Sequence, residues 1–187
     1  MSKTATLSSR RILIMATDGF EQSELEVPLE HLEKAGADVD IASLKTDDIT
    51  GWDKDDWGED VEVDLKIADV DVDDYDALVL PGGQINPDLL RVETDAIEVI
   101  KAFVSAGKPV AAICHAPWLL IEAGLAKGKR MTSYKSIRTD VANAGATVVD
   151  EAVVVDGNLI TSRCPDDLPA FCDAIVTALQ EATEPAN

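Results

Sequence analysis

A cysteine and a histidine stand side by side at positions 114 and 115, inside residues 108–120 (KPVAAICHAPWLL). One apolar run ends at Cys114, and a second begins directly after His115. A thiolate is a strong nucleophile, and an imidazole can take up or release a proton near neutral pH. The pair therefore points to nucleophilic catalysis at the junction of two segments that are apolar enough for the core.

The expected setting of Cys114 is a sharp turn between a strand and a helix. Residues 110–114 (VAAIC) have the pattern of a buried strand, and the residues after His115 have that of a helix. Ala112 and Ala116 flank the cysteine as the small residues of a G-x-S-x-G elbow flank its serine, which allows a tight turn with an exposed thiol. A helix start also favours the thiolate, so we expect a thiol pKa below about 8.5. An inert buried cysteine is the alternative interpretation.

Two backbone N–H groups are candidates for an oxyanion hole beside Cys114. The side chains of adjacent residues on a turn tend to diverge, so the His115 ring is not assigned as the base, but its N–H is well placed. Pro81-Gly82-Gly83 ends another apolar run, and glycines let the backbone approach a ligand closely. The motif is a weak signal alone. Neither a dinucleotide-binding G-x-G-x-x-G nor a Walker lysine pattern accompanies it.

Glu24 follows the first apolar run, within residues 18–28 (DGFEQSELEVP). The pattern Ser23-x-x-Glu26 predicts a capping box, which would place Glu24 in the first turn of a helix. Such an acidic residue most often only complements the helix dipole. Its position after a strand also makes it a candidate site residue.

Strand-like and helix-like segments alternate along most of the chain, which predicts an α/β fold with a mostly parallel sheet covered on both faces. Asp156-Gly157 predicts a hairpin that adds antiparallel strands at one edge. The polar residues 52–64 predict a loop or small hairpin. The strand-like segments are 11–16, 37–44, 76–83, 108–115 and 151–163, and the helix-like segments are 25–35, 94–106, 116–123, 136–144 and 167–181.

Length and composition predict one domain spanning residues 1–187, with its core at about 11–180. The chain has 36 acidic and 16 basic residues and a net charge of −20, so we expect no nucleic-acid partner. A sharper interpretation of the charge is adaptation to concentrated salt, which screens self-repulsion. The N-terminus lacks a secretory pattern and no apolar run is long enough to cross a membrane, so we expect a cytoplasmic protein.

Three cysteines are present, and their odd number and spacing predict no structural disulfide. With only His31 and His115 besides, we expect no zinc site. Cys172 is interpreted as a core residue, and Cys164 as a loop cysteine or, less simply, a resolving thiol. Trp52 and Trp57 are candidates for a pocket or an interface, and spacing does not place Tyr134 or Arg163.

Together these pieces resemble the PfpI-type intracellular protease and protein deglycase family of the class I glutamine amidotransferase-like superfamily. The resemblance covers residues 11–179 and is carried by FEQSELEVPLEHLEKAG, ALVLPGG, GKPVAAICHAPWLLIEAGL, TSYKSIRTDVANAGATVVDEAVVVDGNLITSR and PDDLPAF.

The resemblance implies a flavodoxin-like three-layer sandwich with Cys114 as the nucleophile and His115 beside it. Glu24 would hydrogen-bond the thiol and relay protons, and the backbone of Gly83 and His115 would form the oxyanion hole. Asp88 would orient His115 from a neighbouring subunit, although the loop before it is one residue longer than the family spacing. That role requires a dimer or a larger homo-oligomer, commonly a hexamer. No cofactor or metal is implied.

The resemblance leaves several activities open. Glutaminase chemistry is disfavoured, because no histidine follows His115. The favoured activity is cysteine-dependent action on reactive carbonyls, as a glyoxalase that converts methylglyoxal to lactate or as a deglycase. An intracellular cysteine peptidase is the alternative enzyme. A redox-sensing stress protein or holding chaperone without turnover is the alternative of another class.

Overall fold

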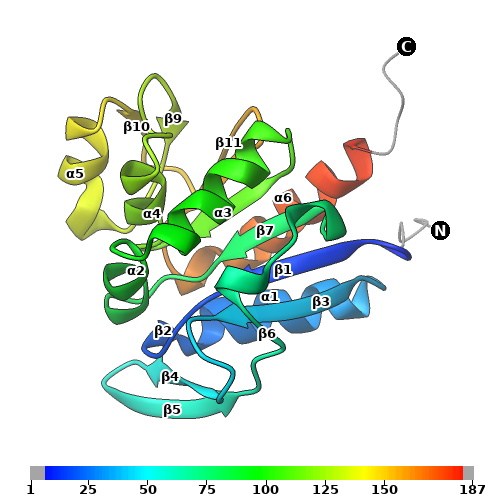
Figure 1. Cartoon of the computed structure of the whole chain (residues 1–187). Coiled ribbons are helices and arrows are strands. Elements are labelled where there is room, and N and C mark those ends of the chain that lie inside the picture. The colour runs from blue at the N-terminus through cyan, green and yellow to red at the C-terminus, as the bar shows by residue number, and fades with distance from the viewer. Residues whose placement is uncertain (1–6, 183–187) are drawn as a thin grey trace.

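The computed structural model describes residues 7–182, in which a seven-stranded sheet runs through the molecule (Figure 1). Its strand order is β11-β12-β8-β7-β1-β3-β6. Neighbouring strands pair in parallel, except β11 with β12. The sheet consists of β1 (Arg11–Met15), β3 (Asp38–Ser43), β6 (Leu65–Lys66), β7 (Ala77–Leu80), β8 (Val110–Ile113), β11 (Val153–Asp156) and β12 (Leu159–Ser162).

The central strands β7 and β8 are buried along their whole length, as their apolar sequences predict for a sheet covered on both faces. Their register pairs Leu80 with Ala112. Because parallel strands end at the same edge, Pro81-Gly82-Gly83 after β7 and Cys114 after β8 come side by side. The register thus brings two predicted motifs together from positions about thirty residues apart.

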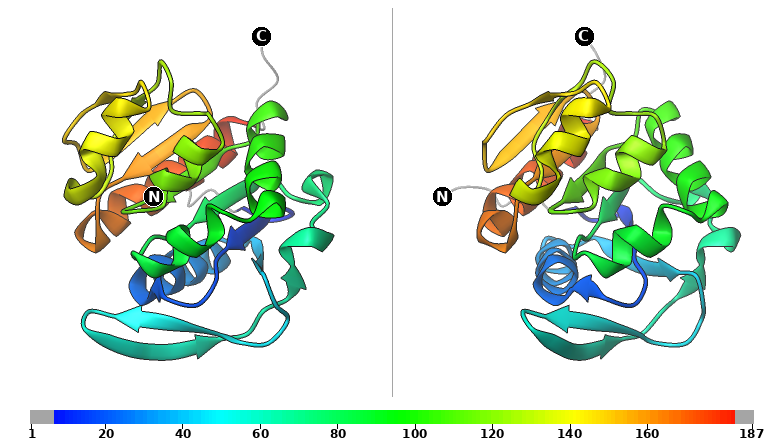
Figure 2. Two further views of the ribbon diagram at one scale, coloured as in Figure 1. Left: turned by 60° about the vertical axis from the view of Figure 1, so that its left-hand side comes forward. Right: turned by 90° about the vertical axis from the view of Figure 1, so that its left-hand side faces the viewer.

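Helices cover both faces of the sheet, as Figure 2 shows from two further directions. On one face, Leu13 and Leu78 pack with Phe103 and Leu119 of two helices, and on the other face Ile14 packs with residues of two more helices. The alternation of neighbouring strand residues between the two clusters confirms the predicted two-sided sheet. The covering helices are α3 (Thr94–Ser105) and α4 (Pro117–Glu122) on the first face and α1 (Gln22–Lys34) and α6 (Leu168–Glu181) on the second.

A second, three-stranded sheet stands at the lower edge of Figure 1. It contains β2 (Phe20–Glu21), β4 (Ile49–Asp53) and β5 (Asp56–Val61), and β4 pairs with β5 in an antiparallel hairpin. The hairpin confirms one of the two predictions for the polar segment. Pairing of β2 with β4 ties the hairpin to the chain just before Glu24.

One local prediction differs from the structure. Helix α1 begins at Gln22 with Glu21 as its N-cap and has no side-chain cap, so the capping box is wrong. Ser23 lies inside the helix and donates its hydroxyl to Glu21 Oε1 at 3.3 Å. Glu24 nevertheless lies in the first turn as predicted. Helix α5 (Arg138–Asn143) lies within the predicted helix 136–144, whereas α2 (Ile85–Leu90) was not predicted. The remaining elements are the paired β9 (Arg130–Met131) and β10 (Thr147–Val148) and short 3-10 turns that include Lys135–Ile137.

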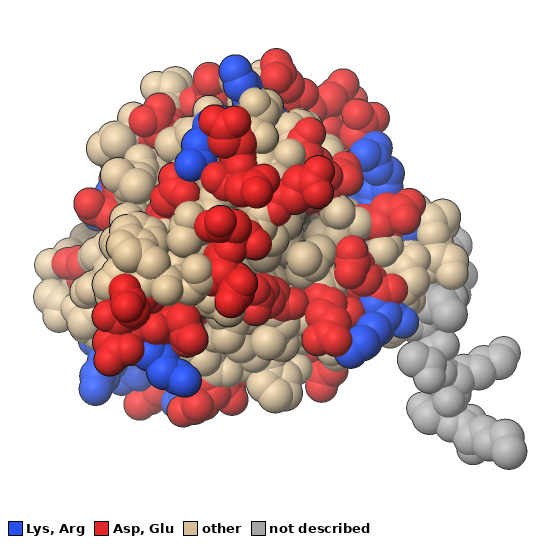
Figure 3. All heavy atoms as spheres, turned by 90° about the horizontal axis from the view of Figure 1, so that it is seen from below, with Lys and Arg blue, Asp and Glu red and all other residues tan. Residues whose placement is uncertain are grey.

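Acidic side chains spread over the molecular surface seen from below in Figure 3, with Lys and Arg in only a few places. The interior is apolar by contrast, and Glu24 is one of few ionisable side chains buried in it. No helix within residues 7–182 has the length and hydropathy needed to cross a membrane.

Candidate active site

Cys114 occupies a strained backbone position directly after β8. Its φ of +65° lies in the left-handed region, which costs a non-glycine residue about 1–2 kcal/mol. The turn is held in place by the Cys114 N–H, which donates to Ser162 O at 3.1 Å, and by Tyr134 N–H, which donates to Cys114 O at 2.8 Å. The sharp strand-to-helix turn expected from the flanking alanines is therefore present. Strain that the surrounding hydrogen bonds enforce is common at functional sites.

The His115 ring contacts the thiol directly, which corrects the expectation that the two side chains diverge. Its Nδ1 lies 3.1 Å from Cys114 Sγ. Consecutive side chains point apart along an extended chain, but the left-handed backbone at Cys114 departs from that geometry. On the other side of the ring, Nε2 lies 3.2 Å from Ser136 Oγ. Ser136 was not among the residues singled out from the sequence.

Aromatic side chains hold the His115 ring on two sides. Tyr134 stacks on it with ring centres 4.8 Å apart, and Trp118 meets it edge-on at 5.2 Å. The residue is 4% exposed, and this burial lowers the pKa of the imidazole below its usual range. The neutral ring at neutral pH can accept a proton.

Glu24 is completely buried beside the thiol. Its Oε2 accepts a hydrogen bond from Gly82 N–H at 2.8 Å, and its Oε1 has no hydrogen-bond partner among the described residues. Burial raises the pKa of Glu24 to about 8, and the charge of Glu21 adds to the effect. Glu24 is therefore a neutral acid at neutral pH, able to donate a proton.

Gly82 separates Glu24 from Cys114. A Cβ at Gly82 would lie 2.6 Å from Glu24 Oε2 and 2.7 Å from Cys114 Cβ, both far too close. The same Cβ would lie 2.6 Å from the Ile113 carbonyl oxygen. Only a glycine allows the carboxyl and the thiol to approach each other here.

The pKa of the Cys114 thiol differs from the sequence prediction. Burial raises it, and an ionised Glu24 would raise it further. The N–H groups of Gly83 and His115 act in the opposite direction by hydrogen bonding to the sulfur. Helix α4 starts only at Pro117 and has 6 residues, so its dipole is too weak to offset burial. A protonated Glu24 removes the second cause of the raised pKa, and the neutral His115 ring beside the sulfur can accept the thiol proton.

The two predicted oxyanion-hole donors converge on the thiol. The backbone N–H groups of Gly83 and His115 both hydrogen-bond to Cys114 sulfur. Gly83 has a φ of +81°, and a Cβ there would lie 2.7 Å from Gly19 O. A carbonyl oxygen on an adduct of Cys114 would find both donors beside the attacking atom.

A pocket of about 450 Å³ opens next to this group. Trp52 of the hairpin forms part of its wall, whereas Trp57 packs edge-on against Trp52 at 5.4 Å and is 52% exposed. The prediction left open whether the tryptophans serve a pocket, and Trp52 does line one. The full lining is Gly19, Glu21, Trp52, Lys54, Gly83, Gln84, Ile85, His115, Tyr134 and Pro165.

Asp88 does not join the site within one subunit. It lies in helix α2 with an exposed side chain, and its carboxylate has no hydrogen bond or ion pair with any residue in the range 7–182. Its expected contact with His115 of a neighbouring subunit stays a prediction.

Cys164 lies in a different pocket, of about 400 Å³, that shares Tyr134 with the thiol pocket and is also lined by Arg163. All three cysteines are free thiols. Cys172 is buried on α6, as predicted. In the part of the chain that the structure describes, no three His, Cys, Asp or Glu side chains are grouped to hold a metal.

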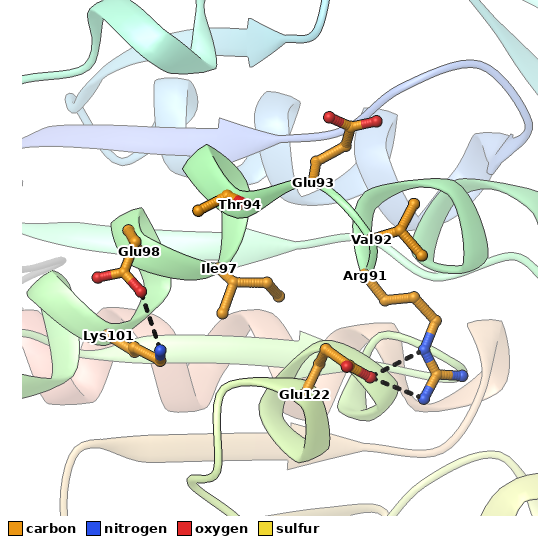
Figure 4. A pocket seen from close by; sticks show the side chains of 8 residues that line it. All are labelled: Arg91, Val92, Glu93, Thr94, Ile97, Glu98, Lys101 and Glu122. Carbon is orange, nitrogen blue, oxygen red and sulfur yellow. Dashed lines mark hydrogen bonds and ion pairs between the residues drawn. The ribbon is translucent and has the colours of Figure 1, made fainter.

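A third pocket, of about 220 Å³, lies near helices α2, α3 and α4 (Figure 4). We call it the Arg91–Glu122 groove, after the arginine that donates to Glu122 Oε2 at 3.1 and 3.3 Å. Lys101 and Glu98 form a second ion pair at its other end, at 2.9 Å. None of the predicted site residues lines it.

Comparison with known proteins identifies the family of this chain. The DJ-1/PfpI family model matches residues 10–178. Deglycase TK1284 of Thermococcus kodakarensis is 45% identical over 91% of this chain and 99% of its own, and putative cysteine protease YraA of Bacillus subtilis is 48% identical over 87% and 94%. The crystal structure of Drosophila melanogaster DJ-1beta superposes with a TM-score of 0.83 and 31% identity, over 92% of this chain and 95% of that one. The chain belongs to the DJ-1/PfpI family.

Proposed function

We propose that this protein is a cysteine-dependent enzyme that acts on reactive carbonyl compounds, with Cys114 as its nucleophile. The observation that carries the proposal is the convergence on one sulfur of a base, two oxyanion donors and a neutral acid. His115 Nδ1 lies 3.1 Å from Sγ, Gly83 and His115 supply N–H groups, and Glu24 has a pKa of about 8. Nucleophilic addition to a carbonyl needs these parts.

In the first step, His115 Nδ1 accepts the thiol proton while sulfur adds to the aldehyde carbon of methylglyoxal. The carbonyl oxygen gains the electron pair of the broken π bond and is held by the N–H groups of Gly83 and His115. A proton returned to this oxygen gives a hemithioacetal. The thiol needs to be ionised only as the bond forms, so its raised pKa is compatible with the step.

In the second step, a proton leaves the former aldehyde carbon and another is added to the neighbouring carbon. Glu24 and His115 are the two groups beside the sulfur that can carry these protons. The product is a lactoyl thioester of Cys114, which water hydrolyses to lactate and the free thiol. The net reaction adds one water to methylglyoxal and needs no external oxidant or reductant.

The same first step supports deglycation. In an aldehyde adduct on an amine or thiol, the C–N or C–S bond breaks, Glu24 gives a proton to the departing amine or thiol, and the adduct's hydroxyl loses its proton to become the carbonyl oxygen again. Cys114 then adds to this carbonyl as in the first step. Relatives named deglycases are 45% and 46% identical to this chain. The pocket is compact, at about 450 Å³, with Trp52 and Tyr134 in its wall. A small electrophile or a modified side chain fits such a space better than an extended peptide does.

A cysteine peptidase is the second candidate, because a relative that is 48% identical is named a putative cysteine protease. The same sulfur and oxyanion donors would then form an acyl-enzyme with a peptide carbonyl. In that case we expect the active form to be a homo-oligomer in which Asp88 of one copy reaches His115 of another.

The test is methylglyoxal consumption with lactate formation by the wild type, Cys114→Ala and Glu24→Gln, in concentrated potassium chloride. Cys164→Ala serves as the matched control, because Cys164 is a free thiol outside this pocket. Lactate from the wild type and Cys164→Ala, but not from Cys114→Ala, supports the proposal. A folded wild type that forms no lactate but cleaves peptides supports the peptidase, and one that turns over neither substrate points to a redox sensor or chaperone.

A further inference from the structure

The imidazole of His115 is held at both of its nitrogens by groups of the same subunit. Nδ1 faces Cys114 Sγ at 3.1 Å, and Nε2 faces Ser136 Oγ at 3.2 Å. Ser136 comes from the 3-10 turn Lys135–Ile137, far from the elbow in sequence. A hydrogen-bonded chain therefore runs from the sulfur through the ring to a serine hydroxyl.

The turn that carries Ser136 is tied to the elbow. Tyr134 N–H donates to Cys114 O at 2.8 Å, and Ile137 N–H donates to Tyr134 O at 3.1 Å. The Tyr134 ring also stacks on the imidazole at 4.8 Å. These contacts fix the residues on both sides of Ser136 and so place this exposed serine beside Nε2.

No charged side chain of this subunit takes the same place. Burial lowers the pKa of His115. Its two ring nitrogens face Cys114 and Ser136, not the pocket residues Glu21 and Lys54. Arg91 and Asp140 reach the ring only through Trp118: the guanidinium lies 5.3 Å from the indole centre, and the carboxylate accepts from indole Nε1 at 3.0 Å. The other titratable neighbours are the contacting Cys114 and Tyr134.

A neutral imidazole has one donor and one acceptor nitrogen. For Nδ1 to accept the thiol proton, the ring proton must be on Nε2, and that N–H needs an acceptor. Ser136 Oγ lies 3.2 Å from Nε2, at the place where such an acceptor is required. Once Nδ1 is protonated, Nε2–H remains bonded to Oγ, and this bond to a charged ring is stronger than before.

We propose that Ser136 is a positioning residue that selects the reactive tautomer of His115 and supports the imidazolium, so that each subunit orients its own histidine. This rests on the proposed function, in which His115 takes the thiol proton. Asp88, exposed on α2, is then dispensable for activating the thiol.

The test is the rate at which iodoacetamide alkylates Cys114 as a function of pH, followed by peptide mass spectrometry so that Cys164 and Cys172 are counted separately. The measurement needs no turnover, so it stands even if lactate formation fails. The variants are Ser136→Ala, Ser136→Thr and Asp88→Asn. Ser105→Ala is the control, since Ser105 is an exposed serine at the end of α3.

We expect Ser136→Ala to slow alkylation at pH 7 about tenfold and to move the pH midpoint upward, because one hydrogen bond to a charged ring is lost. Ser136→Thr, which keeps the hydroxyl, should stay within about twofold of the wild type, as should Asp88→Asn and Ser105→Ala. An unchanged profile for Ser136→Ala, or a loss in Asp88→Asn equal to that of Ser136→Ala, overturns the proposal.

A second readout is the tautomer itself, followed by proton–nitrogen NMR of the imidazoles. The chain has only 2 histidines, so the signals of His115 and His31 are easily assigned. We expect the proton on Nε2 in the wild type and in Ser136→Thr, and a mixture in Ser136→Ala. A wild-type ring protonated on Nδ1 overturns the proposal.

Discussion

The thiol pocket and the Arg91–Glu122 groove are both hollows lined by polar side chains, but they differ in what those side chains do. In the groove, exposed or half-exposed Arg91, Glu122, Lys101 and Glu98 pair with one another (Figure 4). Around the thiol, a carboxyl is completely buried with one oxygen unpaired, and a cysteine has a φ of +65°. Only the thiol pocket contains groups that the fold must hold at a cost in stability.

That difference indicates how a site is recognised in this fold. Exposed ion pairs contribute about 0–1 kcal/mol and need no further explanation. A buried polar atom without a partner costs about 1–3 kcal/mol, and left-handed backbone adds to this. The chain retains both costs at Cys114 and Glu24, which are adjacent in space although 90 residues apart in sequence. The buried unpaired oxygen of Glu24 and the left-handed backbone of Cys114 occur together at one sulfur, and this distinguishes the site from an ordinary surface hollow.

The largest expected effect is that of Gly82→Ala, which tests whether the close approach matters. The new Cβ collides with Glu24, Ile113 and Cys114 at 2.6–2.7 Å. We expect at least about a hundredfold loss of kcat/KM and about 2–4 kcal/mol of stability, measured by lactate formation and urea unfolding. Gly58→Ala is the control, because its clash is with the movable end of the Gln22 side chain. Activity near the wild-type level in Gly82→Ala would show that the close approach of Glu24 to Cys114 is not needed for the reaction.

Glu24→Gln tests, through the pH dependence of stability, whether the buried carboxyl of Glu24 is held at a cost. Between pH 4.5 and about 8, Glu24 is ionised in the unfolded chain but protonated in the folded protein. The folded state then binds more protons, so this group's contribution to stability falls as pH rises across that window. We expect the free energy of unfolding of Glu24→Gln to rise relative to that of the wild type from pH 5 to pH 8. The relative increase should reach about 2–4 kcal/mol at pH 8. A difference in unfolding free energy that is constant with pH would contradict a raised pKa.

The acidic surface should respond to salt where the site does not. With a net charge of −20, we expect potassium chloride at about 2 M to raise Tm by about 5–10 °C over that at about 0.1 M, because repulsion is screened. Potassium sulfate at matched ionic strength separates screening from surface exclusion. A Tm that falls with added chloride argues against adaptation to salt.

The smallest effect is expected at the groove. Glu122→Gln removes the partner of Arg91, but the pair is partly exposed, so stability should change by less than about 1 kcal/mol. The kcat/KM for lactate formation should stay within about twofold of the wild type. A loss comparable to that of Gly82→Ala would mean that the groove takes part in the reaction.

The sequence predicted the fold well wherever an apolar run with clear periodicity is followed by turn-forming residues. The runs before Gly82 and Cys114 became β7 and β8. The hairpin predicted at Asp156-Gly157 became β11–β12, with Gly157 and Asn158 as its turn residues. Helix α2 was missed because Pro87 and the preceding glycines read as a loop. A six-residue helix with an internal proline has too little periodicity to be recognised.

Within the site, the sequence predicted the members but not their contacts. Cys114, Glu24 and Gly83 come together because strand register places their loops at one edge of the sheet. The alternation of strand-like and helix-like segments already predicts such an arrangement. The contact of His115 with the sulfur depends on a left-handed dihedral angle, and the place of Ser136 depends on a turn folded back across the elbow. Neither leaves a pattern in the residue types. The thiol pKa was misjudged because burial, which sequence does not quantify, outweighs a short helix.

The most direct test of the account is whether a carbonyl substrate becomes covalently attached to Cys114. Wild-type protein and Glu24→Gln are mixed with methylglyoxal, quenched in acid within milliseconds to seconds and digested in acid for mass spectrometry. The account predicts an adduct on the Cys114 peptide that forms before lactate and accumulates further in Glu24→Gln. Lactate formation with an unmodified Cys114 at every time point, or adducts confined to Cys164 and lysines, would contradict it.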